Sequence, residues 1–232
     1  MRLAIMQPYF LPYIGYFQLM SAVNVFVIYD EIKYTKKGWI NRNRFLRNGA
    51  DEVFTLPLKK GSDSLQIVER HLAEEFDGRK LLAQFSGAYR HAPCFDSTFD
   101  VLQTIVLHPE RNLFGYLHHS LSVLAAQLDI GAEIRASSSI DFDSQLKAQE
   151  KVLAICEACG ASEYINSIGG TELYSREAFA ARGIELRFLR PHPLEYAQSG
   201  KPFVPCLSIV DVLMFNPASR VASSMLSAYD LI

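Results

Sequence analysis

Apolar runs of strand length alternate with amphipathic stretches along this chain, and the alternation predicts strands separated by helices. Residues 3–6 and 25–29 are apolar runs, and residues 13–23 between them carry apolar side chains at helical spacing. A strand, a helix and a second strand form a βαβ unit, which implies a right-handed crossover and a parallel sheet.

The same rhythm returns in the second half of the chain. Residues 133–136, 163–166 and 184–189 are predicted strands, and residues 174–181 and 207–215 are predicted helices. A further helix is expected to begin at an N-cap, Asp143, and to stop at Gly160. We therefore predict an α/β fold with a mostly parallel, Rossmann-like sheet flanked by helices.

Two segments interrupt this rhythm. Residues 32–60 are predicted to form a β-hairpin insertion, because Asn48 followed by Gly49 signals a tight turn, with the returning strand at residues 52–58. Residues 77–128 contain three stretches with apolar side chains three and four positions apart, which predict a helical layer or cap. We expect one domain that spans residues 1–232.

Composition narrows the classes of partner. A net charge of −2 gives no overall field that would attract nucleic acid or an acidic membrane. The first apolar run ends at Gln7 and Pro8, too early for a signal peptide, and no apolar window is long enough to cross a bilayer. We expect a cytoplasmic protein without a membrane span.

Four cysteines and six histidines are scattered along the chain. Cys156 and Cys159 are spaced like a redox or metal pair, but they lie within a helical pattern and no second pair completes a zinc site. His118 and His119 are adjacent and so point apart on a helix. We expect buried or half-buried free thiols, no metal site and no cofactor.

The densest stretch of unusual residues is the opening turn, residues 7–17. It contains two prolines and five aromatic residues directly after the first predicted strand. Prolines make the turn stiff, and the carboxyl end of a strand is where an open α/β sheet binds ligands. On its own this turn is equally well explained as an aromatic plug of the core.

Basic residues dominate residues 33–47, which contain six of them and no acidic residue. Such a cluster on a nearly neutral protein favours a local anionic ligand, although many charge runs are simply solvated. Trp39, Asn41 and Asn43 are interleaved with Arg42 and Arg44. This mixture is suited to stacking on, and hydrogen bonding to, a sugar or a base.

Two features of the second half are candidate site elements. Gly169 and Gly170 follow a predicted strand, and a Gly-Gly turn can bind an anion through its backbone N–H groups. Asp211 lies within an apolar helix, where a buried carboxylate must find partners or change its pKa. Either feature can equally be structural, as a chain reversal or as a capping side chain.

Together these pieces resemble the WbqC-like family along almost the whole chain. The most specific parts are Gln7 with Pro8 and the Gly-Trp-Ile-Asn-Arg-Asn block of residues 38–43. The resemblance also includes residues 12, 15–16, 26–30, 37, 44, 55–57, 89, 92–93, 164, 169–170, 174, 183–184, 196, 198 and 207–211. One departure is the turn at residues 166–170, where the resemblance leads us to expect a glycine directly after Ser167.

The resemblance implies a gene product of bacterial polysaccharide or O-antigen biosynthesis. The most concrete activity it implies is aminoacyl (glycyl) transfer to a nucleotide-linked amino sugar, with aminoacyl-tRNA as a candidate donor. No Cys-His or Ser-His pattern is evident in the sequence, which favours direct transfer over a covalent acyl-enzyme. An RNA-binding or tRNA-binding protein and a non-catalytic nucleotide-sugar-binding protein remain as alternatives.

Binding roles follow from side-chain chemistry under this hypothesis. Lys37, Arg42 and Arg44 would hold a phosphate or carboxylate, and Trp39 and Tyr16 would stack on a ring. Side-chain amides would read hydroxyl or amide groups of the substrate; these are Gln7, Asn41, Asn43 and Gln198.

Tyr13 and Tyr16 have the spacing at which nucleotidylyltransferase-like α/β folds carry His-x-Gly-His. Both histidines are absent, so the spacing is a fold hint, and both tyrosines are expected at the substrate. Amide formation also needs a base to deprotonate the amine. Asp30, which ends the second predicted strand, and Asp211 are the candidate bases.

Overall fold

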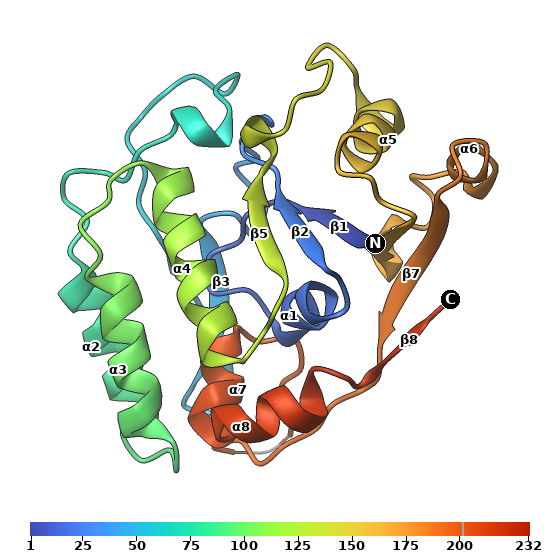
Figure 1. Cartoon of the computed structure of the whole chain (residues 1–232). Helices are drawn as coiled ribbons and strands as arrows, with labels where there is room; N and C mark the ends of the chain where they lie inside the picture. Colours follow the sequence, from blue (N-terminus) through green and yellow to red (C-terminus); the bar gives the residue numbers. More distant parts are fainter. Residues whose placement is uncertain (201) are drawn as a thin grey trace.

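A six-stranded sheet forms the centre of the molecule in the computed structural model, which describes residues 1–200 and 202–232 (Figure 1). The strand order is β5-β2-β1-β6-β7-β8. All neighbouring strands are parallel except β8, which is antiparallel to β7. The strands are β1 (Arg2–Met6), β2 (Val25–Ile28), β5 (Glu133–Ala136), β6 (Glu163–Ser167), β7 (Glu185–Pro191) and β8 (Tyr229–Leu231). The predicted α/β fold with a mostly parallel sheet is confirmed.

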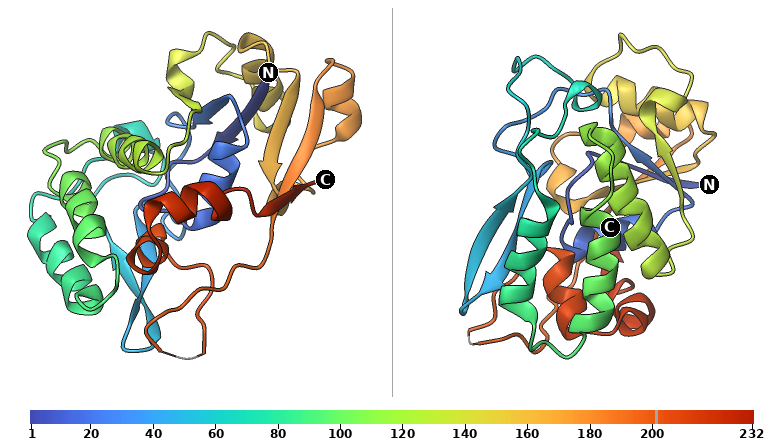
Figure 2. Two further views of the ribbon diagram at one scale, coloured as in Figure 1. Left: turned by 60° about the horizontal axis from the view of Figure 1, so that its bottom comes forward. Right: turned by 90° about the vertical axis from the view of Figure 1, so that its left-hand side faces the viewer.

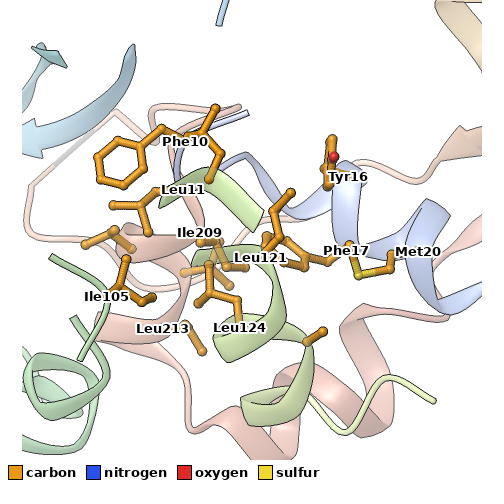
Figure 3. Close-up of a cluster of buried hydrophobic side chains, with 14 of the residues drawn as sticks. Phe10, Leu11, Tyr16, Phe17, Met20, Ile105, Leu121, Leu124, Ile209 and Leu213 are labelled. Atoms are coloured by element: carbon orange, nitrogen blue, oxygen red, sulfur yellow. The ribbon is translucent and has the colours of Figure 1, made fainter. Parts of the chain in front are cut away.

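Helices cover both faces of the sheet because successive side chains of each strand point to opposite faces. Ala4 of β1 belongs to one core, whereas Leu3 and Ile5 belong to the other. Helices α1 (Ile14–Ser21), α4 (Leu113–Gln127) and α7 (Ile209–Phe215) contribute to the first core, and α5 (Ala148–Ala158) and α6 (Arg176–Ala180) to the second. Figure 3 shows the first core, in which Phe17 of α1, Leu121 of α4 and Ile209 of α7 gather.

The chain changes direction across the sheet between β1 and β6. From β1 it proceeds to β2 and β5 on one side, and then returns to β6 and β7 on the other. A crevice forms outside the carboxyl ends of the strands at such a reversal of strand order, because the loops that follow the two adjacent strands lead to opposite sides. This edge of the sheet is therefore the expected ligand-binding edge.

The predicted hairpin consists of β3 (Arg42–Arg47) and β4 (Ala50–Thr55). Its turn residues Asn48 and Gly49 have φ values of 53° and 79°, the left-handed geometry that tight hairpin turns require. The hairpin lies beside the helical layer (Figure 2). The two are packed together, since the Phe85 ring centroid of α2 (Gly78–Tyr89) lies 5.6 Å from that of Phe45 and 5.1 Å from that of Phe54. The third helix of this layer is α3 (Phe95–Val106).

The predicted start of α5 is wrong, and the returning hairpin strand ends at Thr55 rather than at residue 58. Asp143 is not the N-cap of α5, which begins at Ala148; its side chain instead accepts a hydrogen bond from the Gln145 N–H at 2.9 Å in a preceding turn. Ala148 itself has a left-handed φ of 48°, which no local pattern indicates. The end of the helix agrees with the prediction, because Gly160 follows the C-cap with a φ of 68°.

The end of the chain contains α8 (Ala218–Arg220), a π-helical turn (Val221–Met225) and the edge strand β8. Within residues 1–200 and 202–232, no helix is long and apolar enough to cross a membrane. All four cysteines are free thiols; Cys156 is buried, Cys94 and Cys159 are half-buried, and Cys206 is exposed. The described part of the chain gathers no three His, Cys, Asp or Glu side chains that could hold a metal ion.

Candidate functional site

The opening turn and the hairpin enclose a cavity of about 270 Å³, which we call the hairpin hollow. Aromatic side chains, one arginine and two smaller side chains form its walls: Tyr9, Tyr13, Trp39, Asn43, Arg44 and Cys206. The opening turn and the Trp39 segment therefore lie on either side of one hollow. Four residues expected at the substrate, Tyr13, Trp39, Asn43 and Arg44, meet here.

Asn43 joins the hairpin to the opening turn. Its side-chain amide donates to the backbone carbonyls of Phe10 at 3.3 Å and Leu11 at 2.8 Å. The Leu11 carbonyl also accepts a hydrogen bond from Ser208 Oγ at 2.7 Å. Leu11 has a φ of 45°, a conformation that leucine rarely adopts and that needs support from its surroundings. These hydrogen bonds fix the turn, and with it the rings of Tyr9 and Tyr13.

Trp39 is presented at the mouth of the hollow by a short turn. Arg42 holds this turn by donating from Nε to the Gly38 carbonyl at 3.0 Å and from Nη2 to the Lys37 carbonyl at 2.5 Å. The Trp39 side chain is 42% exposed, and the guanidinium groups of Arg42 and Arg44 lie 5.7 and 5.8 Å from its ring centroid. An aromatic face and two cations are thus available side by side.

Arg44 is only partly neutralised. Its Nη1 forms an ion pair with Asp51 at 2.9 Å, and its Nη2 donates to the Cys206 carbonyl at 3.4 Å. Its Nε is buried and has no hydrogen-bond partner among the described residues. Arg42 forms no ion pair with any of the described residues. The mouth of the hollow therefore carries a net positive charge that suits a phosphate or carboxylate.

Three other predicted binding residues lie outside this hollow. Tyr16 is 1% exposed, packs in the core and donates its hydroxyl to the Gln7 carbonyl at 3.0 Å. Asn41 is buried and accepts from the Tyr34 hydroxyl at 2.8 Å. Lys37 is exposed and contributes only its carbonyl to the Trp39 turn. Tyr16 and Asn41 act as structural supports in this geometry.

Asp30 follows β2 at the carboxyl edge of the sheet, as predicted, but its carboxylate is turned inward. It is 1% exposed, and its Oδ1 accepts from Ser137 Oγ at 2.7 Å and from the Ser138 N–H at 3.0 Å. These bonds join the ends of β2 and β5. The carboxylate therefore orders the strand ends that border the crevice.

Asp211 and Gln198, two further predicted residues, form one buried network. The Asp211 carboxylate accepts hydrogen bonds from the hydroxyls of Tyr89 at 2.8 Å and Tyr196 at 2.6 Å, and from Gln198 Nε2 at 2.8 Å. Burial raises the pKa of Asp211, whereas its three donors favour the charged form. The Gln198 side chain also donates a hydrogen bond to the Val204 carbonyl and accepts one from the Val204 N–H. The network fastens the loop that carries Cys206 to α7.

Gly169 and Gly170 form a 3₁₀ turn (Ile168–Gly170) at the carboxyl end of β6. A Cβ on Gly170 would lie 2.8 Å from Asn166 Nδ2, so a larger residue there would force the Asn166 side chain to shift. Gln7 lines a second cavity, of about 420 Å³, at the carboxyl ends of β1 and β2. We call it the strand-end hollow; the two hollows share no lining residue.

Several residues that shape the hollows were not predicted. Tyr9 could have been found, since it lies in the same proline-rich turn as Tyr13. Cys206 has no local signal, because it reaches the hairpin hollow only through the bridge between Tyr13 and Ser208. Lys151 of the strand-end hollow lies in an ordinary helical pattern.

Comparison with known proteins gives a family and one named relative. The model of the WbqC-like protein family matches residues 7–223. A protein of Mycobacterium tuberculosis (strain ATCC 25618 / H37Rv), described as "Uncharacterized protein Rv1507c", is 27% identical over 219 residues, which cover 93% of each chain. No solved structure matches.

Proposed function

This chain belongs to the WbqC-like protein family, and from that premise we propose that it is a cytoplasmic transferase of cell-surface polysaccharide biosynthesis. Its substrate is a nucleotide-linked amino sugar, and the group transferred is an aminoacyl group such as glycyl. One observation carries the proposal: an exposed Trp39 under two guanidinium groups borders a hollow walled by the rings of Tyr9 and Tyr13.

The hairpin hollow suits the nucleotide end of this substrate. Its volume of about 270 Å³ is slightly below the range of about 300–1,000 Å³ that is usual for small-molecule sites. It therefore accommodates a flat ring and part of its sugar, with the remainder of the ligand outside. Trp39 and Tyr13 stack on the base, and Arg42 and Arg44, with Lys37 nearby in sequence, bind the diphosphate.

The transfer itself needs few protein groups. The amine of the sugar attacks the acyl carbon of an activated ester, a C–N bond forms, the C–O bond breaks, and the leaving alcohol takes a proton. The attacking amine must first lose a proton, for which Asp30 and Asp211 remain the candidate acceptors.

Aminoacyl-tRNA remains the candidate donor, but a primary role in RNA binding is less well supported. Three of the six cations of residues 33–47 already form ion pairs, which reduces the charge they offer to a polyanion: Lys36 with Asp63, Arg44 with Asp51, and Arg47 with Glu52. RNA affinity depends on unpaired cations that release counterions from phosphates. Salt-sensitive retention of the protein on tRNA would revive this alternative.

The proposal is tested by binding and by turnover. Thermal shift and calorimetric titration with a panel of nucleotide-linked sugars should give binding that Trp39→Ala and Arg42→Ala each weaken about tenfold or more. Arg47→Ala is the matched control, because Arg47 lies on the same hairpin but neither lines the hollow nor lies over the Trp39 ring. Mass spectrometry of an amino-sugar substrate incubated with glycyl-tRNA should detect the glycyl product. Absence of binding across the whole panel would refute the proposal.

A further inference from the structure

The strand-end hollow is a second cavity with the character of a binding site. It lies where Gln7 follows β1 and Tyr29 follows β2, and residues Gln149 and Lys151 of α5 close it from the other side. Lys33 and Tyr174 complete its polar wall. The hollow therefore collects residues from four separate parts of the chain.

Its position in the fold is the one that open parallel sheets use for ligands. The strand order reverses between β1 and β6, and α5 is the helix that crosses over to β6. Gln7 lies directly after β1 and Tyr174 lies beyond the carboxyl end of β6. The hollow thus coincides with the crevice that the topological switch creates.

The charge of its lining is purely positive. Lys33 and Lys151 line the hollow, and no aspartate or glutamate does. Neither lysine forms an ion pair with another residue of the described ranges. Glu150, which lies between Gln149 and Lys151 in sequence, pairs with Arg182 at 3.1 Å and not with either lysine. Two cations that form no ion pair and line one cavity favour an anionic ligand.

The Lys151 side chain is held at the hollow by two aromatic rings. Its ammonium lies 5.6 Å from the ring centroid of Tyr29 and 5.4 Å from that of Phe142. Two cation–π contacts restrict the side chain without neutralising its charge. Such an arrangement preserves a full positive charge at the mouth of the cavity.

Hydrogen-bonding groups in the same wall also lack partners. The Gln7 side-chain amide and the Tyr29 hydroxyl make no hydrogen bond to the part of the chain that the structure describes. Gln149 uses its Oε1 to accept from the Ser175 N–H at 2.6 Å, which leaves its NH₂ group for another acceptor. Polar groups that converge on a cavity without internal partners are typical of ligand sites.

We propose that the strand-end hollow binds the phosphate of a phosphorylated small molecule, with Lys33 and Lys151 as its cationic ligands. Lysine is a common phosphate-binding residue, and the side chains of Gln7 and Gln149 supply neutral hydrogen bonds to the rest of the ligand. The volume of about 420 Å³ exceeds what an inorganic phosphate needs, so an organic group accompanies the phosphate. This site is separate from the hairpin hollow and does not depend on the transferase proposal.

Calorimetric titration of the full-length protein at low ionic strength tests the assignment. The probes are inorganic pyrophosphate, glucose 1-phosphate and ribose 5-phosphate, none of which carries a base for the hairpin hollow, with acetate as a carboxylate probe. Lys33→Met and Lys151→Met remove each charge but keep an apolar chain of similar length, so the Lys151 site between its two rings stays filled. Lys80→Met, on the exposed surface of α2, is the matched control.

At least one phosphorylated organic probe should bind, more tightly than pyrophosphate or acetate, and each of the two hollow variants should weaken it about tenfold. Lys80→Met and Trp39→Ala should leave this binding unchanged. Absence of binding by the wild-type protein, or equal binding by wild type and Lys151→Met, would overturn the proposal. Loss of binding in Trp39→Ala would move the phosphate to the hairpin hollow and would overturn it as well. If nucleotide-linked sugars do not bind at Trp39, the binding of a phosphorylated probe at Lys33 and Lys151 is still expected, so the two proposals can fail independently.

Discussion

The buried Asp211 network allows a quantitative prediction about stability. The Asp211 side chain is 0% exposed and accepts hydrogen bonds from Tyr89, Tyr196 and Gln198. Substitution Asp211→Ala removes the acceptor of all three donors. Gln198 keeps the Val204 carbonyl as a partner at 3.0 Å, but the two tyrosine hydroxyls lose the acceptor of their protons.

The magnitude follows from the donors that are left. Each buried donor without a partner costs about 1–3 kcal/mol, so the two hydroxyls together cost about 2–6 kcal/mol. Loss of the carboxylate recovers part of this, because burial already disfavours its charged form and raises its pKa. We expect Asp211→Ala to lower the free energy of unfolding by about 3–5 kcal/mol, the usual cost of removing one partner from a buried charged network.

Urea unfolding followed by circular dichroism at pH 7 measures this change. Asp100→Ala, at an exposed position of α3, is the control and should change stability by no more than about 0.5 kcal/mol. Tyr196→Phe should cost clearly less in the Asp211→Ala background than in the wild type, because its partner is already gone. A loss below about 1 kcal/mol for Asp211→Ala, or fully additive double variants, would refute the reasoning.

Three further predictions concern single positions. The folded-state pKa of Asp211 is raised above its ordinary value of 3.8, so its titration contributes stability at acid pH that is lost as the pH rises through the folded-state pKa. In urea unfolding, the free energy of unfolding of the wild type minus that of Asp211→Asn should therefore fall across this window, since carboxylates with lowered pKa values, such as Glu110 and Asp230, act on both proteins alike. Asn43→Ala removes the donor to two buried carbonyls of the opening turn and should lower the free energy of unfolding by about 1–3 kcal/mol, whereas an unchanged urea midpoint would contradict the joining role. Gly170→Ala places a Cβ within 2.8 Å of Asn166 and should lower the free energy of unfolding by about 1–3 kcal/mol. Gly169→Ala, with no atom within 4 Å of its Cβ, should leave the free energy of unfolding nearly unchanged in the same urea experiment.

The candidate site was predictable where its residues are neighbours in sequence. Trp39, Asn43 and Arg44 lie within six positions, and a single turn and strand bring them to one hollow. The stiff opening turn was recognisable from its prolines. The strand-end hollow was not recognised, because Lys151 and Gln149 lie on a helix that only the crossover to β6 brings beside Gln7.

Local sequence by itself determined the elements and the hairpin. Apolar periodicity marks each strand of the parallel sheet except the short β8, and Asn48 with Gly49 adopts the left-handed turn that this pair favours. These features depend on the conformational preferences of residues that are adjacent in sequence, so they can be predicted from the residue types alone. The start of α5 was the exception, since the left-handed Ala148 has no such preference.

Tertiary structure alone decided what the two candidate carboxylates do. Asp30 meets Ser137 across 107 positions of the chain, and Asp211 meets Tyr89 across 122. The state of a buried carboxylate depends on which donors reach it and on how much water is excluded, and neither is a local property. The same holds for the opening turn, whose rings line a hollow only because Asn43 and Ser208, from distant segments, hold its carbonyls in place.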